Sequence, residues 1–111
     1  MDAHTFAALG EPSRLQIVEH LRDRPFSVGD LAEALTIRQP QVSKHLRVLR
    51  EAGIVAAEPV ARMRVHYLRA EPFEEIGGWA SSFEQVWEAR LDSLEGFLRS
   101  MGEASGEEGM P

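Results

Sequence analysis

Apolar positions in the first half of the chain recur every three or four residues, the spacing of a helix with one buried side. The first stretch ends at Gly10. The second carries Pro12 in its first turn and the apolar residues Leu15, Ile17, Val18 and Leu21 behind it, and its helix must stop just before Pro25. The pattern predicts four helices, over residues 3–9, from 12 to just before 25, over 27–35 and over 39–52.

The third and fourth of these helices are short, and each has a narrow apolar side. Ser27 and Asp30 have capping-box spacing at the start of the third helix. Val42, Leu46 and Leu49 line one side of the fourth. Because only about four residues, TIRQ, separate the two helices, the pattern predicts a helix-turn-helix.

After Gly53, which suits a left-handed helix terminator, the period changes from helical to alternating. We expect two strands, Ile54–Val60 and Met63–Ala70, with a tip near Ala61–Arg62. Pro59 cannot donate to a sheet ladder, so its strand should lie at an edge. A hairpin directly after the second helix of a helix-turn-helix is a wing, over about residues 54–70.

A long helix should follow, over about residues 72–101. Its apolar residues recur at spacings of three and four: Ile76, Ala80, Phe83, Trp87, Leu91, Leu94 and Leu98. A chain of 111 residues offers too little surface to cover such a helix, and bare apolar patches of this size mark interfaces. We therefore expect it to pack against its twin in a homodimer, with residues 3–9 assisting and with Phe83, Trp87, Leu91, Leu94 and Leu98 at the contact.

Composition places the chain among ordinary globular proteins, at 43% apolar and 27% charged residues. Residues 1–101 are predicted to form a single winged-helix domain, and the Gly-, Glu- and Ser-rich residues 102–111 a disordered acidic tail. The sequence has neither a continuous apolar run long enough to span a membrane nor a secretory signal. We therefore expect a cytoplasmic protein.

The net charge of −6 is unevenly distributed. Residues 1–35 carry −3, residues 36–69 carry +5, and residues 70–111 carry −8. The basic block coincides with the fourth helix and the predicted wing, and clustered positive charge attracts phosphate. Opposite its apolar side the fourth helix carries polar and basic residues, and the wing adds two arginines near its tip. These residues are Pro40, Ser43, Lys44 and Arg47 on the helix and Arg62 and Arg64 on the wing.

Four blocks resemble, in order and spacing, those of the ArsR/SmtB-type winged-helix repressors: ALGEPSRLQIVEHL, SVGDLAEAL, QPQVSKHLRVLREAGIV and ARMRVHYLR. The resemblance covers about residues 3–70. It implies a dimeric, mainly α fold with a β-hairpin wing, and a repressor that binds an inverted-repeat operator in double-stranded DNA and releases it on a signal. The resemblance also implies that the recognition helix lies in the major groove and the wing on the flanking backbone. Carried over from the family, the DNA-facing residues are Gln39, Pro40, Gln41, Ser43, Lys44, Arg47, Arg62 and Arg64.

The chain departs from the metal-sensing members of that family. It has no cysteine, and its last helix has no histidine. The acids Glu84, Glu88, Asp92 and Glu95 follow helical spacing, but such a run is more often a solvated face than a metal site. We expect no metal, no cofactor and no catalytic activity, because neither a phosphate loop nor a nucleophile motif is present. The effector, if one exists, is not identified.

The histidines and tryptophans have plainer interpretations. His4 and His20 are expected at or near the surface, and His45 partly buried beside the apolar side of its helix. His66 is expected on the wing surface, with DNA contact as the less favoured alternative. Trp79 and Trp87 fit a dimer core better than a cofactor stack. A different function also stays open, namely a winged-helix module that binds proteins and not specific DNA.

Overall fold

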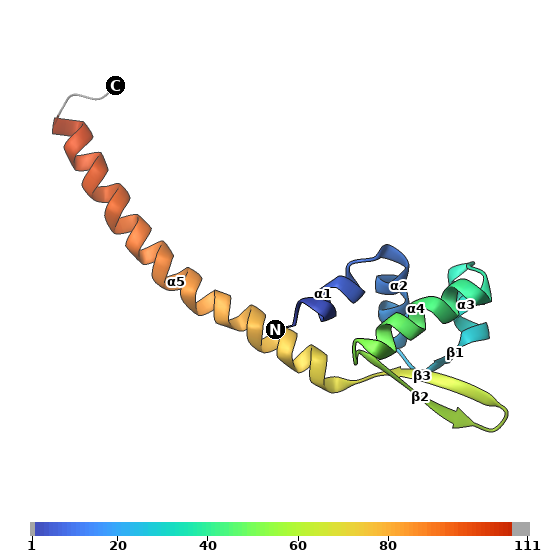
Figure 1. Ribbon diagram of the computed structural model, residues 1–111. Coiled ribbons are helices and arrows are strands. Elements are labelled where there is room, and N and C mark those ends of the chain that lie inside the picture. The colour runs from blue at the N-terminus through green and yellow to red at the C-terminus, as the bar shows by residue number, and fades with distance from the viewer. Residues whose placement is uncertain (1, 108–111) are drawn as a thin grey trace. The chain divides into compact units, whose positions relative to one another are not determined.

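The computed structural model describes residues 2–107 (Figure 1), and these divide into two compact units between Ile76 and Gly77. The first unit contains, in chain order, α1 (Ala3–Leu9), α2 (Pro12–Leu21), β1 (Phe26–Ser27), α3 (Val28–Leu35), α4 (Gln39–Glu51), β2 (Val55–Val60) and β3 (Met63–Leu68). The last helix, α5 (Ala70–Glu107), begins in the first unit and makes up the described part of the second. The mainly helical winged helix-turn-helix expected from the sequence is confirmed.

The three helices α2, α3 and α4 enclose the core of the first unit. Its fully buried apolar side chains are Ile17, Leu31, Val42, Leu46, Leu49 and Ile54. Val42, Leu46 and Leu49 form the inner side of α4, as their spacing predicted. The prediction for Leu15 was wrong, because its side chain is 47% exposed. The other three apolar residues named for this helix, Ile17, Val18 and Leu21, do form its buried side.

Side-chain caps begin the helices where the sequence predicted. The Ser27 hydroxyl accepts the backbone N–H of Asp30 at 3.1 Å, which confirms that half of the predicted capping box. Glu11 caps α2 in the same way by accepting from the backbone N–H of Arg14 at 2.8 Å. Each cap satisfies a backbone donor that the first helical turn would otherwise leave unpaired.

A tight turn of three residues, Thr36 to Arg38, joins α3 to α4. Thr36 ends α3 in the left-handed conformation, with φ 55° and ψ 48°, and its N–H bonds back to the carbonyl groups of Ala32 and Glu33. A β-branched residue seldom occupies this region, and the sequence offered no sign of it. Gly53 has φ 76° after α4, in agreement with its predicted role as terminator.

The sheet has three antiparallel strands in the order β1–β3–β2. The hairpin of β2 and β3 runs from Val55 paired with Leu68 to Val60 paired with Met63, close to the predicted bounds. Pro59 lies on an edge strand, as expected. The sequence missed β1, whose two residues pair with His66 and Val65 of β3, because two residues are too few for alternation to be visible.

The second unit is described through Glu107 and is a single helix. The predicted start at residue 72 was two residues late, since α5 begins at Ala70 and has Pro72 in its first turn, where proline is tolerated. The helix also continues past the predicted end at Met101, through residues assigned to the tail. Residues 108–111 of that predicted tail lie outside the described residues.

Candidate nucleic-acid interface

The outer side of α4 presents every candidate residue of that helix to solvent. The side chains of Gln39, Pro40, Gln41, Ser43, Lys44 and Arg47 are all exposed. They are held there by the buried inner side, which prevents α4 from rotating about its axis without unburying Val42, Leu46 and Leu49. The amides, hydroxyl and cations of this set can hydrogen-bond to base edges and phosphates.

The N-terminal end of α4 adds a cation that sequence reasoning missed. Arg38 is exposed and occupies the N-cap position, where its side chain makes no capping hydrogen bond. Its position directly before a predicted recognition helix was the available signal. The N-terminal residues of such a helix lie nearest the base edges in helix-turn-helix complexes, and the helix dipole there favours phosphate.

Arg47 is engaged with a neighbour on the same helix. Its Nε lies 3.2 Å from Oε1 of Glu51, one turn later, and both side chains are mostly exposed. An exposed pair of this kind contributes little to stability. A phosphate can therefore displace Glu51 at small cost, and Arg47 stays a candidate for DNA contact.

The wing places two more arginines in solvent. Arg62 lies in the turn between β2 and β3. Arg64 is the second residue of β3 and pairs with Pro59 beside that turn. Ala61, the first turn residue, has φ 55°, a conformation that a two-residue hairpin turn requires. Figure 1 shows the hairpin tip directed toward the same side of the first unit as the N-terminal end of α4.

His66 corrects the expected surface position. Its side chain is only 2% exposed, and its Nε2 lies 3.1 Å from a terminal nitrogen of Arg50 at the end of α4. Because a guanidinium only donates, Nε2 must accept and Nδ1 must carry the proton. That Nδ1 makes no well-formed hydrogen bond within residues 2–102, although the backbone of Phe26 lies close enough to favour a proton on the ring. The sequence placed Arg64, His66 and Leu68 on one side of β3, but could not show that α4 covers the middle one.

The environment of His66 disfavours a positive charge. Burial lowers the pKa of its imidazole below the usual 6.5, and the nearby charges of Arg50 and Arg64 lower it further. The backbone of Phe26 on β1 acts in the opposite direction, but burial and the arginines prevail. His66 is therefore neutral at physiological pH.

Two of the pockets that border α4 also involve residues of neighbouring segments. One, of about 370 Å³, is lined by Ser13, Ile37, Gln41, Lys44 and His45. His45 is partly buried as expected, with its Nδ1 3.7 Å from a carboxylate oxygen of Glu11. This carboxylate places a negative charge beside Lys44 and Gln41, so it opposes deeper penetration by a phosphate.

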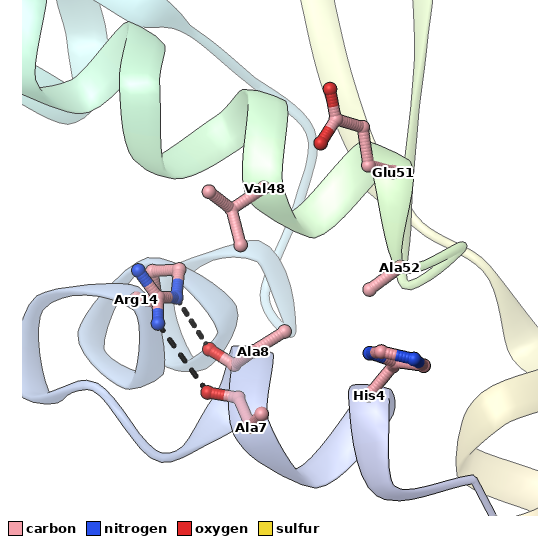
Figure 2. A pocket seen from close by; sticks show the side chains of 7 residues that line it. All are labelled: His4, Ala7, Ala8, Arg14, Val48, Glu51 and Ala52. Carbon is pink, nitrogen blue, oxygen red and sulfur yellow. Dashed lines mark hydrogen bonds between the residues drawn. The ribbon is translucent and has the colours of Figure 1, made fainter.

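The other pocket, of about 260 Å³, lies between α1, α2 and α4 (Figure 2). The one arginine that lines this pocket, Arg14, already makes two hydrogen bonds. Its guanidinium donates to the carbonyl of Ala8 at 2.6 Å and to that of Ala7 at 3.3 Å, at the end of α1. This arrangement caps a helix whose last carbonyls lack partners. Arg14 therefore serves the fold.

The described part of the second unit exposes a continuous apolar side. The five residues predicted at a dimer contact, Phe83, Trp87, Leu91, Leu94 and Leu98, are 42 to 63% exposed. The rings of Trp79 and Phe83 meet edge to face, with centroids 4.9 Å apart. A hollow on this side is lined by Phe83, Val86, Trp87 and Arg90. Apolar surface of this extent is typical of an interaction face.

Two absences among the described residues bear on other functions. Within residues 2–102 no three His, Asp or Glu side chains lie together so that they could hold a metal ion. None of the described helices is long and apolar enough to cross a membrane.

Comparison with known proteins decides the family. The model for bacterial regulatory proteins of the arsR family matches residues 11–57, from the cap of α2 into β2. A transcriptional regulator of Mycobacterium tuberculosis, Rv2034, is 43% identical over 86% of this chain and 87% of its own length. The chain belongs to the ArsR family. Its members, and hence this chain, are DNA-binding transcriptional regulators.

Other relatives agree with this assignment. NmtR, another regulator of M. tuberculosis, is 47% identical over 60% of this chain. The matched region spans only 55% of the length of NmtR. An ArsR-like regulator from Rhodococcus sp. RHA1 superposes with a TM-score of 0.77 over 88% of this chain and 90% of that chain. At 24% identity this likeness shows the fold alone.

Proposed function

We propose that this ArsR-family chain is a repressor that binds an inverted-repeat operator as a homodimer. In this proposal the outer side of α4 enters the major groove, where Gln39, Gln41 and Arg47 are placed to reach base edges. Pro40, Ser43 and Lys44 lie against the sugar-phosphate backbone of the DNA, and Arg62 and Arg64 of the wing contact the DNA backbone that flanks this groove. The observation that carries the proposal is the exposed, largely polar and basic side of α4 opposite a fully buried apolar one.

The apolar side of α5 supports the homodimer. Phe83, Trp87, Leu91, Leu94 and Leu98 lie exposed along one side of the helix, and a second copy offers the same apolar side in return. A two-fold dimer presents two copies of α4, which fits an operator with two half-sites about one helical turn apart.

We further propose that the chain does not sense transition metals. Thiolates and imidazoles are the ligands that such sites prefer, the sequence contains no cysteine, and α5 contains no histidine. The proposal predicts that zinc or nickel leaves operator affinity unchanged. Release of the operator by either ion would refute it.

The test is a fluorescence-anisotropy titration against the DNA upstream of the protein's own reading frame, with a scrambled duplex as control. A preference of about a thousandfold or more for the upstream DNA, which declines steeply as salt rises, is expected of a sequence-specific regulator. Arg47→Ala should weaken specific binding about tenfold or more. Arg22→Ala is the matched control, because Arg22 also makes an exposed ion pair within one helix, with Glu19.

Equal, weak binding to several candidate upstream duplexes and to scrambled DNA would contradict the proposal. It would favour the second function, a winged helix that binds another protein. In that case the partner should compete with the basic side of α4 or with the apolar side of α5. Pull-down with the Arg47→Ala and Trp87→Ala variants would then distinguish the two surfaces.

A further inference from the structure

The outer part of the wing has little support from the rest of the fold. The short strand β1 pairs with β3 only at His66 and Val65. Beyond them the wing consists of β2 and β3 alone, from Glu58 paired with Val65 to Val60 paired with Met63. Two-stranded hairpins are marginally stable by themselves. The position of Arg62 and Arg64 therefore depends on what holds the hairpin near His66.

Two arginine contacts tie the hairpin to the end of α4. At the base, Arg69 donates to the carbonyl of Gly53, in the turn between α4 and β2, at 3.1 Å. Farther toward the tip, Arg50 of α4 donates to Nε2 of His66 at 3.1 Å. Among the hydrogen bonds of the described residues, the second is the one nearest the tip that joins the wing to the recognition helix.

We propose that the Arg50–His66 pair is a positioning device, which fixes the wing against the recognition helix so that Arg62 and Arg64 meet the DNA backbone. The inference rests on the proposed DNA binding. Neither residue faces DNA itself: His66 is buried, and the guanidinium of Arg50 is used on His66. Their effect on DNA is exerted through the wing.

Strand geometry shows why one contact at this place matters. At about 3.3 Å per residue, the turn residue Arg62 lies roughly 13 Å along the strand from His66. A tilt of about 10° at His66 would therefore move the tip by about 2 Å. A hydrogen bond to a phosphate does not survive a shift of that size.

The pair also makes wing position depend on pH. The charged groups that act on His66 are Arg50 of α4 and Arg64 of β3, while β1 contributes the backbone of Phe26. The Phe26 ring in turn carries Arg24 on one side, 3.8 Å from its centroid, and the edge of His20. A proton on Nε2 abolishes its acceptor and places two positive charges in contact. The wing should then loosen as the pH falls below about 6.5.

The first test needs no DNA. Backbone amide exchange in residues 58–64 is measured for the wild type, His66→Leu and His66→Gln. Leucine removes the acceptor, so exchange should accelerate about tenfold or more, whereas the glutamine oxygen can still accept from Arg50 and should keep exchange near wild type. His4→Leu is the matched control, because His4 lies on α1 outside the wing. Unchanged wing exchange in His66→Leu would overturn the inference.

The pH dependence separates positioning from general stability and serves if His66→Leu does not fold. Wing amides of the wild type should lose protection as the pH falls below about 6.5, after correction for intrinsic exchange. Those of His66→Gln should not, although this variant retains His4, His20 and His45. Identical pH profiles in the two proteins would overturn the inference.

The second test measures binding to a mixed-sequence duplex over a salt series. His66→Leu should reduce the slope of log affinity against log salt by about 0.9 for each phosphate that the wing no longer neutralises, at most about two per wing. Added to a protein that already carries Arg62→Ala and Arg64→Ala, it should cost nothing more. Fully additive reductions would show that His66 acts elsewhere. If the wild type bound no duplex, the proposed function would fail, while amide exchange would still decide the positioning.

Discussion

The exposed indole of Trp87 offers a sharp test of the proposed dimer. Trp87 is 63% exposed on the apolar side of α5, between Phe83 and Leu91. A tryptophan buries up to about 250 Å², so about 150 Å² remain to be covered by a partner. At about 25 cal/mol per Å², full coverage is worth at most about 4 kcal/mol per copy.

Truncation to alanine should cost less than this limit, because interfaces pack imperfectly and association has its own entropy cost. A value of about 2 kcal/mol per copy is typical of a central aromatic residue. A two-fold dimer contains Trp87 twice, so Trp87→Ala should weaken dimerisation by about 4 kcal/mol. That corresponds to roughly a thousandfold rise in the dissociation constant.

The assay is sedimentation velocity from nanomolar to high micromolar protein, with circular dichroism to check helix content. Alanine is the strongest helix former, so loss of the dimer could not be attributed to an unfolded α5. Gln85→Ala is the matched control, because Gln85 lies two residues after Phe83 and hence about 200° around the helix. A monomeric wild type, or a Trp87→Ala variant that dimerises as strongly as Gln85→Ala, would refute the assignment of this surface.

Three further predictions concern the fold. Thr36→Gly should raise the free energy of unfolding by about 0.5–1 kcal/mol in urea titration. Glycine removes a strain of about 1–2 kcal/mol at φ 55°, but its greater conformational freedom in the unfolded chain offsets part of that gain. The free energy of unfolding should fall as the pH drops below about 6.5. The pKa of His66 is lower in the folded protein than in the unfolded chain, so the unfolded chain binds more protons in this range. The stability that neutral His66 contributes is complete above that pH and is lost below it. His66→Gln should remove this part of the pH dependence, and an unchanged profile would contradict the assignment. Gly78→Ala should raise the thermal midpoint, because alanine favours the helix over glycine by up to about 1 kcal/mol and nothing lies within 4 Å of the added methyl group. A lower midpoint would reveal a partner that approaches α5 at this position.

The sequence predicted those parts of the fold that depend on local signals. The bounds of α1 and α4 follow from apolar spacing and from the terminators Gly10 and Gly53, so they were found within a residue. The hairpin was found within two residues, because alternation in MRVHYL is visible over a full strand; the second strand ends at Leu68 and not at the expected Ala70.

What the sequence missed depends on contacts between distant segments. The side of β3 that carries His66 could be identified from alternation, but only the packing of α4 decides that this side is inner. β1 exists because Phe26 and Ser27 happen to lie beside β3, forty residues later in the chain. The left-handed Thr36 is likewise imposed by the packing of α3 against α4.

Packing also corrects the number of cations available to DNA. Residues 36–69 contain seven Lys and Arg side chains, and their sum was the reason to suspect DNA binding. Arg50 and Arg69 are committed to His66 and to Gly53, which leaves five: Arg38, Lys44, Arg47, Arg62 and Arg64. If each neutralises one phosphate, the slope of log affinity against log salt reaches at most about 4.5 for one chain and about 9 for a dimer. A measured slope above about 4.5 would therefore require two chains on the DNA. If the protein is an established dimer, a slope near 5 would mean that about half of its ten available cations do not reach a phosphate.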